Sequence, residues 1–198
     1  KFRRQRQMCI RDRIIAGDYR GRALTPVGKG DPSAHLRPTT DRVRESLFNV
    51  LAGGRFGDAI RGISVLDLFA GTGALGLEAL SRGAADVTFV DDGTAALKLI
   101  RRNVALCNAE DTTNIMRRDA RRLGPRQADP FGLVFLDPPY GMGRGEAAFA
   151  AAQAGGWIAP NALVVWEENT VITIPQTCQL LDTRRYGDTI ISILRYCC

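Results

Sequence analysis

The chain has 198 residues, 45% of them hydrophobic, which is enough for one globular domain with a single buried core. Its longest apolar stretches have the length of a strand and fall short of the roughly 20 residues that a bilayer span requires, so a membrane protein is not expected. Because no signal pattern opens the chain, we expect a cytoplasmic protein. Five scattered cysteines and one histidine show no metal-ligand or disulfide spacing, which predicts reduced thiols and no metal site.

The formal net charge is +6, and the excess lies at the N-terminal end. Residues 1–44 contain twelve Lys or Arg against four Asp, a balance of +8, whereas the rest of the chain sums to −2. A basic arm on a nearly neutral body is typical of nucleic-acid-binding proteins, although a solvated tail without a partner has the same composition. The candidate RNA-binding residues are Arg13, Arg20, Arg22, Arg37 and Arg42.

The first 38 residues divide into three parts. Residues 1–12 show no periodicity and are interpreted as a disordered or non-native extension. Short runs at 13–17 and 21–25 flank a turn and predict a small hairpin set apart from the main sheet. The Gly- and Pro-rich stretch that follows predicts a loop. Residues 13–38 therefore form a basic hairpin and loop ahead of a main domain at 39–198.

The main domain opens with a helix and then alternates strands with helices. Thr39 or Thr40 can cap the first helix, whose apolar stripe ends near Gly53. The alternation predicts an α/β fold in which helices cover both faces of a mostly parallel sheet. The expected strands are 63–69, 86–90, a weak one at 114–116, 131–136 and 162–166, and the expected helices are 73–82, 94–107 and 145–155. Two final strands, 176–186 and 188–196, are too close for a crossover and should pair antiparallel.

A glycine-containing loop follows the first strand of the alternation and opens a helix: Asp67-Leu-Phe-Ala-Gly71-Thr-Gly73-Ala-Leu-Gly76. Glycines allow a tight turn and let a ligand approach the backbone at the start of a helix, where amides are unpaired. Asp91 lies 24 positions after Asp67, at the end of the next strand, which is roughly the spacing at which an acid binds ribose hydroxyls. Together these features predict an adenosine-bearing cofactor.

The acid at the start of this loop decides between cofactors. Asp67 would repel a pyrophosphate, whereas a cofactor with an ammonium and no phosphate suits it, and S-adenosylmethionine meets both conditions. Asp67 can instead stabilise the turn or cap the helix, and Asp92 competes with Asp91 for the ribose. Asp119, after the third strand, can meet the adenine amino group, cap a short helix at 120–123, or do both.

Four residues follow the apolar strand at 131–136: Asp137, Pro138, Pro139 and Tyr140. This is the carboxyl end of a buried strand, where open α/β sheets bind ligands. The prolines leave carbonyls free as acceptors, and the tyrosine ring can stack on a nucleobase, an interaction worth roughly 1–3 kcal/mol. Acceptors beside a stacking ring predict a substrate amino group on a planar base, although Tyr140 can also be a plain turn residue.

The predicted reaction is methyl transfer to that amine. Asp137 and the Pro138 carbonyl would each accept one N–H, which turns the lone pair of the nitrogen out of the ring plane toward the methyl group. Asp137 need not be a strong base, because the amine becomes acidic only after it has been alkylated. Tyr140 would stack on a base rotated out of its helix.

The glycine-containing loop and the Asp137–Tyr140 motif resemble those of the RsmD-like family of bacterial small-subunit ribosomal RNA guanine-N2 methyltransferases. Three further stretches share this resemblance: Arg13-Ile-Ile-Ala-Gly, Leu36-Arg-Pro-Thr39 and Asp41-Arg-Val-Arg-Glu-Ser-Leu-Phe48. The resemblance extends from Arg13 to about Tyr196. It implies a Rossmann-like class I methyltransferase fold with strand order 3-2-1-4-5-7-6 and S-adenosyl-L-methionine as cofactor. It also implies methylation of the N2 amine of one guanine in 16S ribosomal RNA within an assembling subunit. We expect the enzyme to be a monomer.

The resemblance also assigns roles within the cofactor site. Gly71 and Gly73 would shape the turn, Asp67 would lie near the methionine ammonium, and Asp91, commonly Glu in the family, would hold the ribose. Thr39 would lie near the methionine carboxylate, or cap the helix, or both. The remaining candidates for the cofactor site are Phe69, Asp119 and Ala120.

Three other functions share parts of this pattern. An adenine-N6 DNA methyltransferase has the same motifs, but the chain leaves no segment large enough for a duplex-reading domain. A nicotinamide-dependent oxidoreductase accounts for the glycines and Asp91, but not for Asp137-Pro-Pro-Tyr140. A catalytically idle RNA-binding assembly factor would have no need of Asp67 and Asp137.

Overall fold

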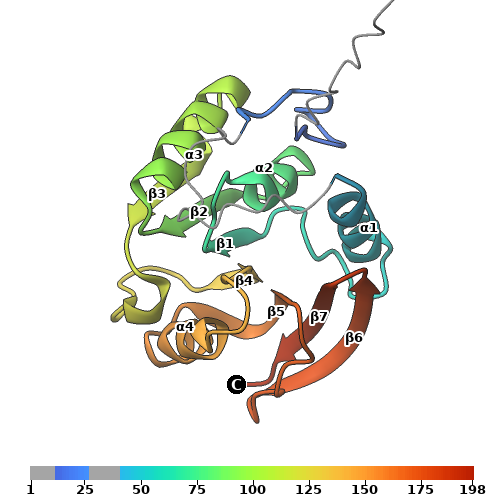
Figure 1. Ribbon diagram of the computed structural model, residues 1–198, viewed down its shortest axis with the longest axis vertical. Helices are drawn as coiled ribbons and strands as arrows, with labels where there is room; N and C mark the ends of the chain where they lie inside the picture. Colours follow the sequence, from blue (N-terminus) through green and yellow to red (C-terminus); the bar gives the residue numbers. More distant parts are fainter. Residues whose placement is uncertain (1–11, 27–40) are drawn as a thin grey trace, which may run out of the picture.

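The computed structural model describes residues 12–26 and 41–198, and a seven-stranded sheet forms its centre (Figure 1). The strands are β1 Ser64–Leu68, β2 Asp86–Asp91, β3 Thr113–Arg117, β4 Phe131–Leu136, β5 Ile158–Glu168, β6 Cys178–Tyr186 and β7 Thr189–Tyr196. Their order is β3-β2-β1-β4-β5-β7-β6, and β7 runs in the direction opposite to the other six strands. The expected α/β class, strand order and antiparallel final pair are confirmed.

Helices cover both faces of this sheet. They are α1 Asp41–Ala52, α2 Ala74–Ser81, α3 Thr94–Cys107 and α4 Arg144–Ala154, with short 3-10 turns η2 Glu110–Thr112 and η3 Ala120–Arg122. In Figure 1, α1, α2 and α3 lie on one face of the sheet and α4 on the other. None of the helices in the described part of the chain has the length and apolar character of a membrane span.

β5 is longer than the apolar run at 162–166 that predicted it. Its first residues pair only through Ile158 with Phe131, and the register shifts before Leu133. Asn161 has a φ of 62°, so the strand is irregular where its polar residues lie. The hydrophobic pattern does not identify this irregular first part of β5, because apolar and polar residues do not alternate there.

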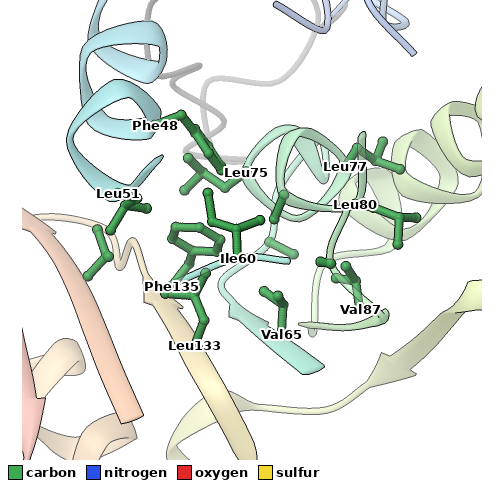
Figure 2. Close-up of a cluster of buried hydrophobic side chains, with 14 of the residues drawn as sticks. Phe48, Leu51, Ile60, Val65, Leu75, Leu77, Leu80, Val87, Leu133 and Phe135 are labelled. Atoms are coloured by element: carbon green, nitrogen blue, oxygen red, sulfur yellow. The ribbon is translucent and has the colours of Figure 1, made fainter. Parts of the chain in front are cut away.

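Alternation along the strands produces two hydrophobic layers. On β4, Leu133 and Phe135 join the core under α1, α2 and α3, whereas Val134 and Leu136 join the core under α4. Figure 2 shows Phe48 and Leu51 of α1 meeting the first of these pairs, and the rings of Phe48 and Phe135 lie 5.7 Å apart. Each large buried side chain contributes about 1.5–3 kcal/mol, so both layers hold the strand ends firmly in place.

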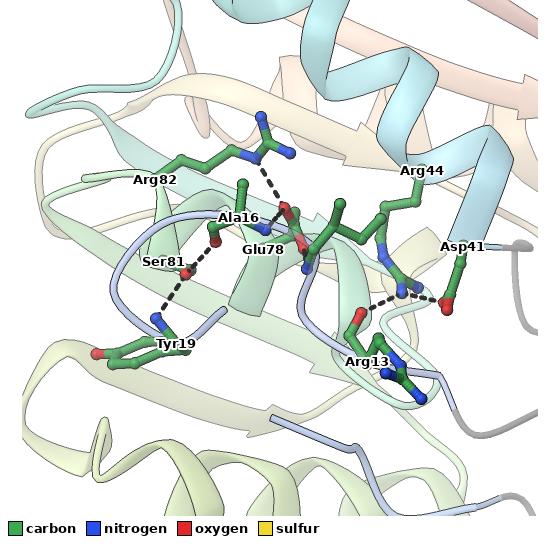
Figure 3. Close-up of polar contacts among 9 residues, drawn as sticks. Arg13, Ala16, Tyr19, Asp41, Arg44, Glu78, Ser81 and Arg82 are labelled. Atoms are coloured by element: carbon green, nitrogen blue, oxygen red, sulfur yellow. Dashed lines mark hydrogen bonds and ion pairs between the residues drawn. The ribbon is translucent and has the colours of Figure 1, made fainter. Parts of the chain in front are cut away.

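The N-terminal segment 12–26 folds back on itself, with one antiparallel bridge between Arg13 and Ala23. The amides of Ile14 and Leu24 donate to the carbonyls of Arg22 and Asp12, so the two runs of the expected hairpin lie side by side without forming regular strands. Its backbone also bonds to side chains of α2. Glu78, which is fully buried, accepts hydrogen bonds from the amides of Ile15 (2.7 Å) and Ala16 (3.2 Å). These contacts (Figure 3) dock the segment on α2, and the segment contributes no strand to the seven-stranded sheet.

Replacing Gly17 with alanine should release this segment. Gly17 has a φ of 81°, and an added Cβ would lie 1.7 Å from the Ser81 carbonyl oxygen, which accepts the Asp18 amide. A left-handed non-glycine residue costs about 1–3 kcal/mol, and here the backbone clash adds to it. Thermal unfolding and limited proteolysis within residues 12–26 measure the effect.

Gly21→Ala is the matched control for this change. Gly21 has the same φ of 81°, but an added Cβ there would meet no other atom within 4 Å. It should therefore show the conformational strain alone. Equal losses of stability in the two variants would contradict the docking of Gly17 against Ser81.

Candidate functional site

The carboxyl end of β1 begins the candidate cofactor site. Asp67 is 1% exposed, and its Oδ2 accepts a hydrogen bond from the Gly76 amide in the first turn of α2 at 3.0 Å. Burial raises the pKa of Asp67 to about 8, the Gly76 amide lowers it, and the charge of Asp91 raises it. The helix-capping role that sequence left open for Asp67 is therefore present, and a ligand cation beside it would favour the charged carboxylate.

The loop after Asp67 turns through left-handed backbone. Phe69 has a φ of 60°, Gly71 of 57° and Gly73 of 77°. A phenylalanine in this region costs about 1–3 kcal/mol, and such strain is concentrated at functional sites. A Cβ at Gly76 would lie 2.4 Å from the Phe89 ring, so that glycine lets α2 pack closely on β2. The expected roles of Gly71 and Gly73 in shaping the turn agree with these angles.

Asp91 ties the ends of β1 and β2 together. Its Oδ2 accepts the Gly71 amide at 2.9 Å, and its Oδ1 accepts the Gly93 amide at 2.8 Å. Burial raises the pKa of Asp91, and these two amides lower it. Asp92 is exposed. Of the two competing acids, Asp91 is the one built into the glycine turn, and its ribose contact stays a prediction.

Asp119 lies after β3, the strand that pairs with β2. Its Oδ1 accepts the Arg121 amide at 2.9 Å at the start of η3, and its Oδ2 pairs with the Arg121 guanidinium at 2.8 Å. The Arg121 side chain is the main cause that lowers the pKa of Asp119. Capping of the short helix is thus present. Ala120, the next residue, is buried.

The Asp137–Tyr140 loop leaves β4 beside the end of β1. The Asp137 amide donates to the Leu68 carbonyl at 3.4 Å, which places the loop next to the glycine turn. Burial raises the pKa of Asp137 well above its ordinary value, and the charges of Glu167, Asp67 and Glu168 raise it further. Pro138 is buried, whereas Asp137 keeps part of its surface exposed.

Sequence reasoning missed the partners of this loop. The Tyr140 hydroxyl donates to Glu167 Oε1 at 2.8 Å and lies 3.2 Å from Thr189 Oγ1. A signal was present, because Glu167 and Glu168 end β5, and the carboxyl ends of parallel strands share one edge of the sheet. Thr189 begins β7 and has no local signal, since only the antiparallel pairing of β5 with β7 brings it to Tyr140.

A buried asparagine links the N-terminal segment to the glycine turn. Asn103 of α3 donates to the Thr72 carbonyl at 2.8 Å, and its Oδ1 accepts the Thr25 amide at 2.8 Å. It is fully buried. These contacts could not be predicted from the position of Asn103 on an amphipathic helix, because they join residues far apart in the sequence.

The RNA-binding candidates differ in how free their side chains are. Arg13, Arg20 and Arg42 are exposed. Arg22 is half-buried, donates to the Leu106 carbonyl at 2.7 Å and lies over the Tyr19 ring. Part of the positive charge near the N-terminus is therefore engaged in contacts within the protein. Arg37 and Thr39 lie outside the described residues, as do most of the expected loop and of the extension at 1–12.

Arg44 is another basic residue whose charge does not reach the surface. It is fully buried in α1, and it donates to the Arg13 carbonyl and to Asp41 (Figure 3). Its burial shows that the count of basic residues in the N-terminal arm overstates the positive charge available to a nucleic acid.

The assembled edge of the sheet is acidic. Five carboxylates lie at the carboxyl ends of β1, β2, β4 and β5, at positions Asp67, Asp91, Asp137, Glu167 and Glu168. Such an edge suits a cationic ligand and hydrogen-bond donors on a substrate, and it disfavours a pyrophosphate. Across residues 12–26 and 41–198, no group of His, Cys, Asp and Glu has a metal-binding arrangement. The residues present therefore fit S-adenosylmethionine, whose sulfonium and ammonium are cationic.

Comparisons with known proteins match most of the chain. The family model described as Conserved hypothetical protein 95 matches residues 12–195. The Ribosomal RNA small subunit methyltransferase D of Escherichia coli (strain K12) is 40% identical over 171 residues, covering 85% of this chain and 81% of the relative. The Putative rRNA methyltransferase YlbH of Bacillus subtilis (strain 168) is 34% identical over 189 residues, covering 92% and 98%. The solved structure of a putative methyltransferase, yhhF, from Escherichia coli superposes with a TM-score of 0.79 at 35% identity, covering 94% of this chain and 98% of that one.

Proposed function

The chain belongs to the Conserved hypothetical protein 95 family, and from this premise we propose that it methylates the exocyclic N2 amine of a guanine in small-subunit (16S) ribosomal RNA. The methyl donor is S-adenosyl-L-methionine. One observation carries the proposal: the Asp137–Tyr140 loop, with its acceptors and its ring, lies beside the glycine turn that begins at Asp67. Methyl donor and target amine can therefore meet at one edge of the sheet.

The bound cofactor would supply a methyl group on a positively charged sulfur. Asp67 would hold its ammonium, Asp91 its ribose hydroxyls, and the strained turn at Phe69, Gly71 and Gly73 would follow its outline. Asp119 and Ala120 would flank the adenine, and Thr39 would lie near the methionine carboxylate. All of these residues except Thr39, which lies outside the described residues, are found at the carboxyl ends of the strands or in the loops that follow those strands.

The target amine would be held by Asp137 and the Pro138 carbonyl. Two acceptors in the plane of the base would fix both N–H bonds and so turn the nitrogen lone pair out of that plane. The amine would lose a proton only after the new C–N bond has formed and the C–S bond of the donor has broken, and Asp137 would receive that proton. Tyr140 would stack on the flipped base with its ring face.

The RNA backbone would be held by the exposed arginines. Arg13, Arg20 and Arg42, together with Arg37, would contact phosphates and orient the substrate without reading its sequence. The proposed setting is an assembling small subunit in the cytoplasm, modified by a monomer of this protein. Arg22 is expected to act mainly through its contacts with Leu106 and Tyr19.

A methyl-incorporation assay tests this function. The protein and labelled S-adenosyl-L-methionine are incubated with small subunits from cells that lack the enzyme, with naked 16S RNA, and with duplex DNA. Label should enter the ribosomal RNA, and mass spectrometry should place it on the N2 of one guanine. Label on adenine in the duplex would support a DNA methyltransferase instead, and cofactor binding without any transfer would support an assembly factor.

A further inference from the structure

The hydroxyl group of Tyr140 is occupied by the protein on two sides. It donates to Glu167 Oε1 at 2.8 Å, and Thr189 Oγ1 lies 3.2 Å away. Glu167 belongs to β5 and Thr189 begins β7, and these two strands pair antiparallel in the sheet. Two partners on adjacent strands fix the end of the ring much more firmly than two partners on loops would.

The backbone around Tyr140 offers little support of its own. Tyr140 lies between β4 and α4, and the two glycines that follow, Gly141 and Gly143, have φ values of 71° and 61°. Met142 between them is 57% exposed. Glu168 accepts a hydrogen bond from the Gly141 amide as well as from Asn169. The end of β5 therefore holds this loop by two consecutive carboxylates.

The hydrogen bond between Tyr140 and Glu167 also determines which part of the Tyr140 side chain a substrate can contact. Burial, and then the Glu167 charge, raise the pKa of Tyr140, so its hydroxyl stays protonated and donates. Glu167 itself is 7% exposed. With the hydroxyl turned to Glu167, a flat base can meet only the ring, and the angle of the ring is set by where the hydroxyl is held.

We propose that Glu167 is a positioning residue that holds the Tyr140 ring, through the hydroxyl and with Thr189, at the angle required to stack on the target base. The inference rests on the proposed function, since it assigns the ring to a base that is methylated. Glu167 acts through Tyr140 and does not contact the reacting atoms.

Four variants of the protein test it: Glu167→Ala, Glu167→Gln, Tyr140→Phe and the double variant Glu167→Ala with Tyr140→Phe. The first and third each remove the hydrogen bond, and each should lower kcat/KM for the RNA about tenfold, the scale of one charge-assisted hydrogen bond. Glu167→Gln keeps an acceptor oxygen and should stay within about threefold of wild type. The double variant should equal Tyr140→Phe, because the two residues act as one unit.

Three controls separate positioning from general damage. Glu110→Ala removes an exposed carboxylate from η2 and should leave kcat/KM unchanged. Calorimetry should show unchanged affinity for S-adenosyl-L-methionine in all four variants, since the cofactor residues are untouched. Thermal unfolding identifies any variant that is simply unstable.

A readout without turnover keeps the inference separate from the proposed function. The chain has four tyrosines, so a spectrum of protein with ¹³C-labelled tyrosine, assigned through Tyr140→Phe, follows the Tyr140 ring directly. Its signal should shift and broaden in Glu167→Ala and stay close to wild type in Glu167→Gln. An unchanged ring signal, or losses of activity that add in the double variant, would overturn the positioning role. A wild-type protein that fails to methylate small-subunit RNA would instead count against the proposed function.

Discussion

Replacing Asp137 with alanine is expected to abolish methyl transfer while leaving the affinity for S-adenosyl-L-methionine within a few fold of wild type. The substitution removes the acceptor that would hold the target amine, and the residues assigned to the cofactor lie on other strands. Loss of one preorganised polar contact typically costs about 100–1,000-fold in kcat. Single-turnover methyl incorporation measures the transfer step, and calorimetry measures cofactor binding.

The pH profile provides a second test of Asp137. Burial and the charges of Glu167, Asp67 and Glu168 raise its pKa well above the ordinary value, so a substantial fraction becomes protonated as the pH falls. A protonated carboxyl accepts the amine less well, so kcat should decline toward acid pH with an apparent pKa far above that of a free aspartate. Unchanged turnover in Asp137→Ala would refute the assignment outright.

The second large effect concerns Asp67, whose pKa burial raises to about 8. At neutral pH its carboxyl is largely protonated, whereas the ammonium of the cofactor pairs with the carboxylate. Binding should therefore release a proton, and the dissociation constant should fall by up to about tenfold per pH unit as the pH rises toward 8. Calorimetry in buffers of different ionisation heat measures the proton release.

The ionisation of Asp67 should also affect the stability of the fold, in the direction opposite to its effect on cofactor binding: a rise in pH should strengthen binding and lower stability. The folded-state pKa of Asp67 lies above its ordinary value of 3.8, so its contribution to stability is fully present below that value and is lost as the pH rises toward 8. Asp67→Asn still offers an oxygen to the Gly76 amide, so α2 keeps its cap. This variant should bind the cofactor weakly and without proton release. A dissociation constant independent of pH between about 6 and 9 in the wild type would contradict the role of Asp67.

Local sequence was sufficient to predict the strands and helices of the main domain, except for the irregular first part of β5. Buried strands such as β4 have continuous apolar runs, and the residues that follow them were placed correctly at the carboxyl edge of the sheet. The order of the strands came from family resemblance, because periodicity reports burial and not which strand lies next to which. The docking of the N-terminal segment on α2 could not be predicted from local sequence, since the amides of Ile15 and Ala16 bond to Glu78, which is 63 and 62 positions away.

By itself, then, the sequence determined the α/β class, the glycine turn and the loop at Asp137, because each depends on residues within a few positions of one another. Only the tertiary structure decided that Glu167 and Thr189 hold Tyr140, and that Asp67 and Asp137 share one acidic edge. These relations join separate strands across the sheet. The shifted pKa values follow from the same cause, because burial and neighbouring charge are properties of the folded chain and not of any local pattern.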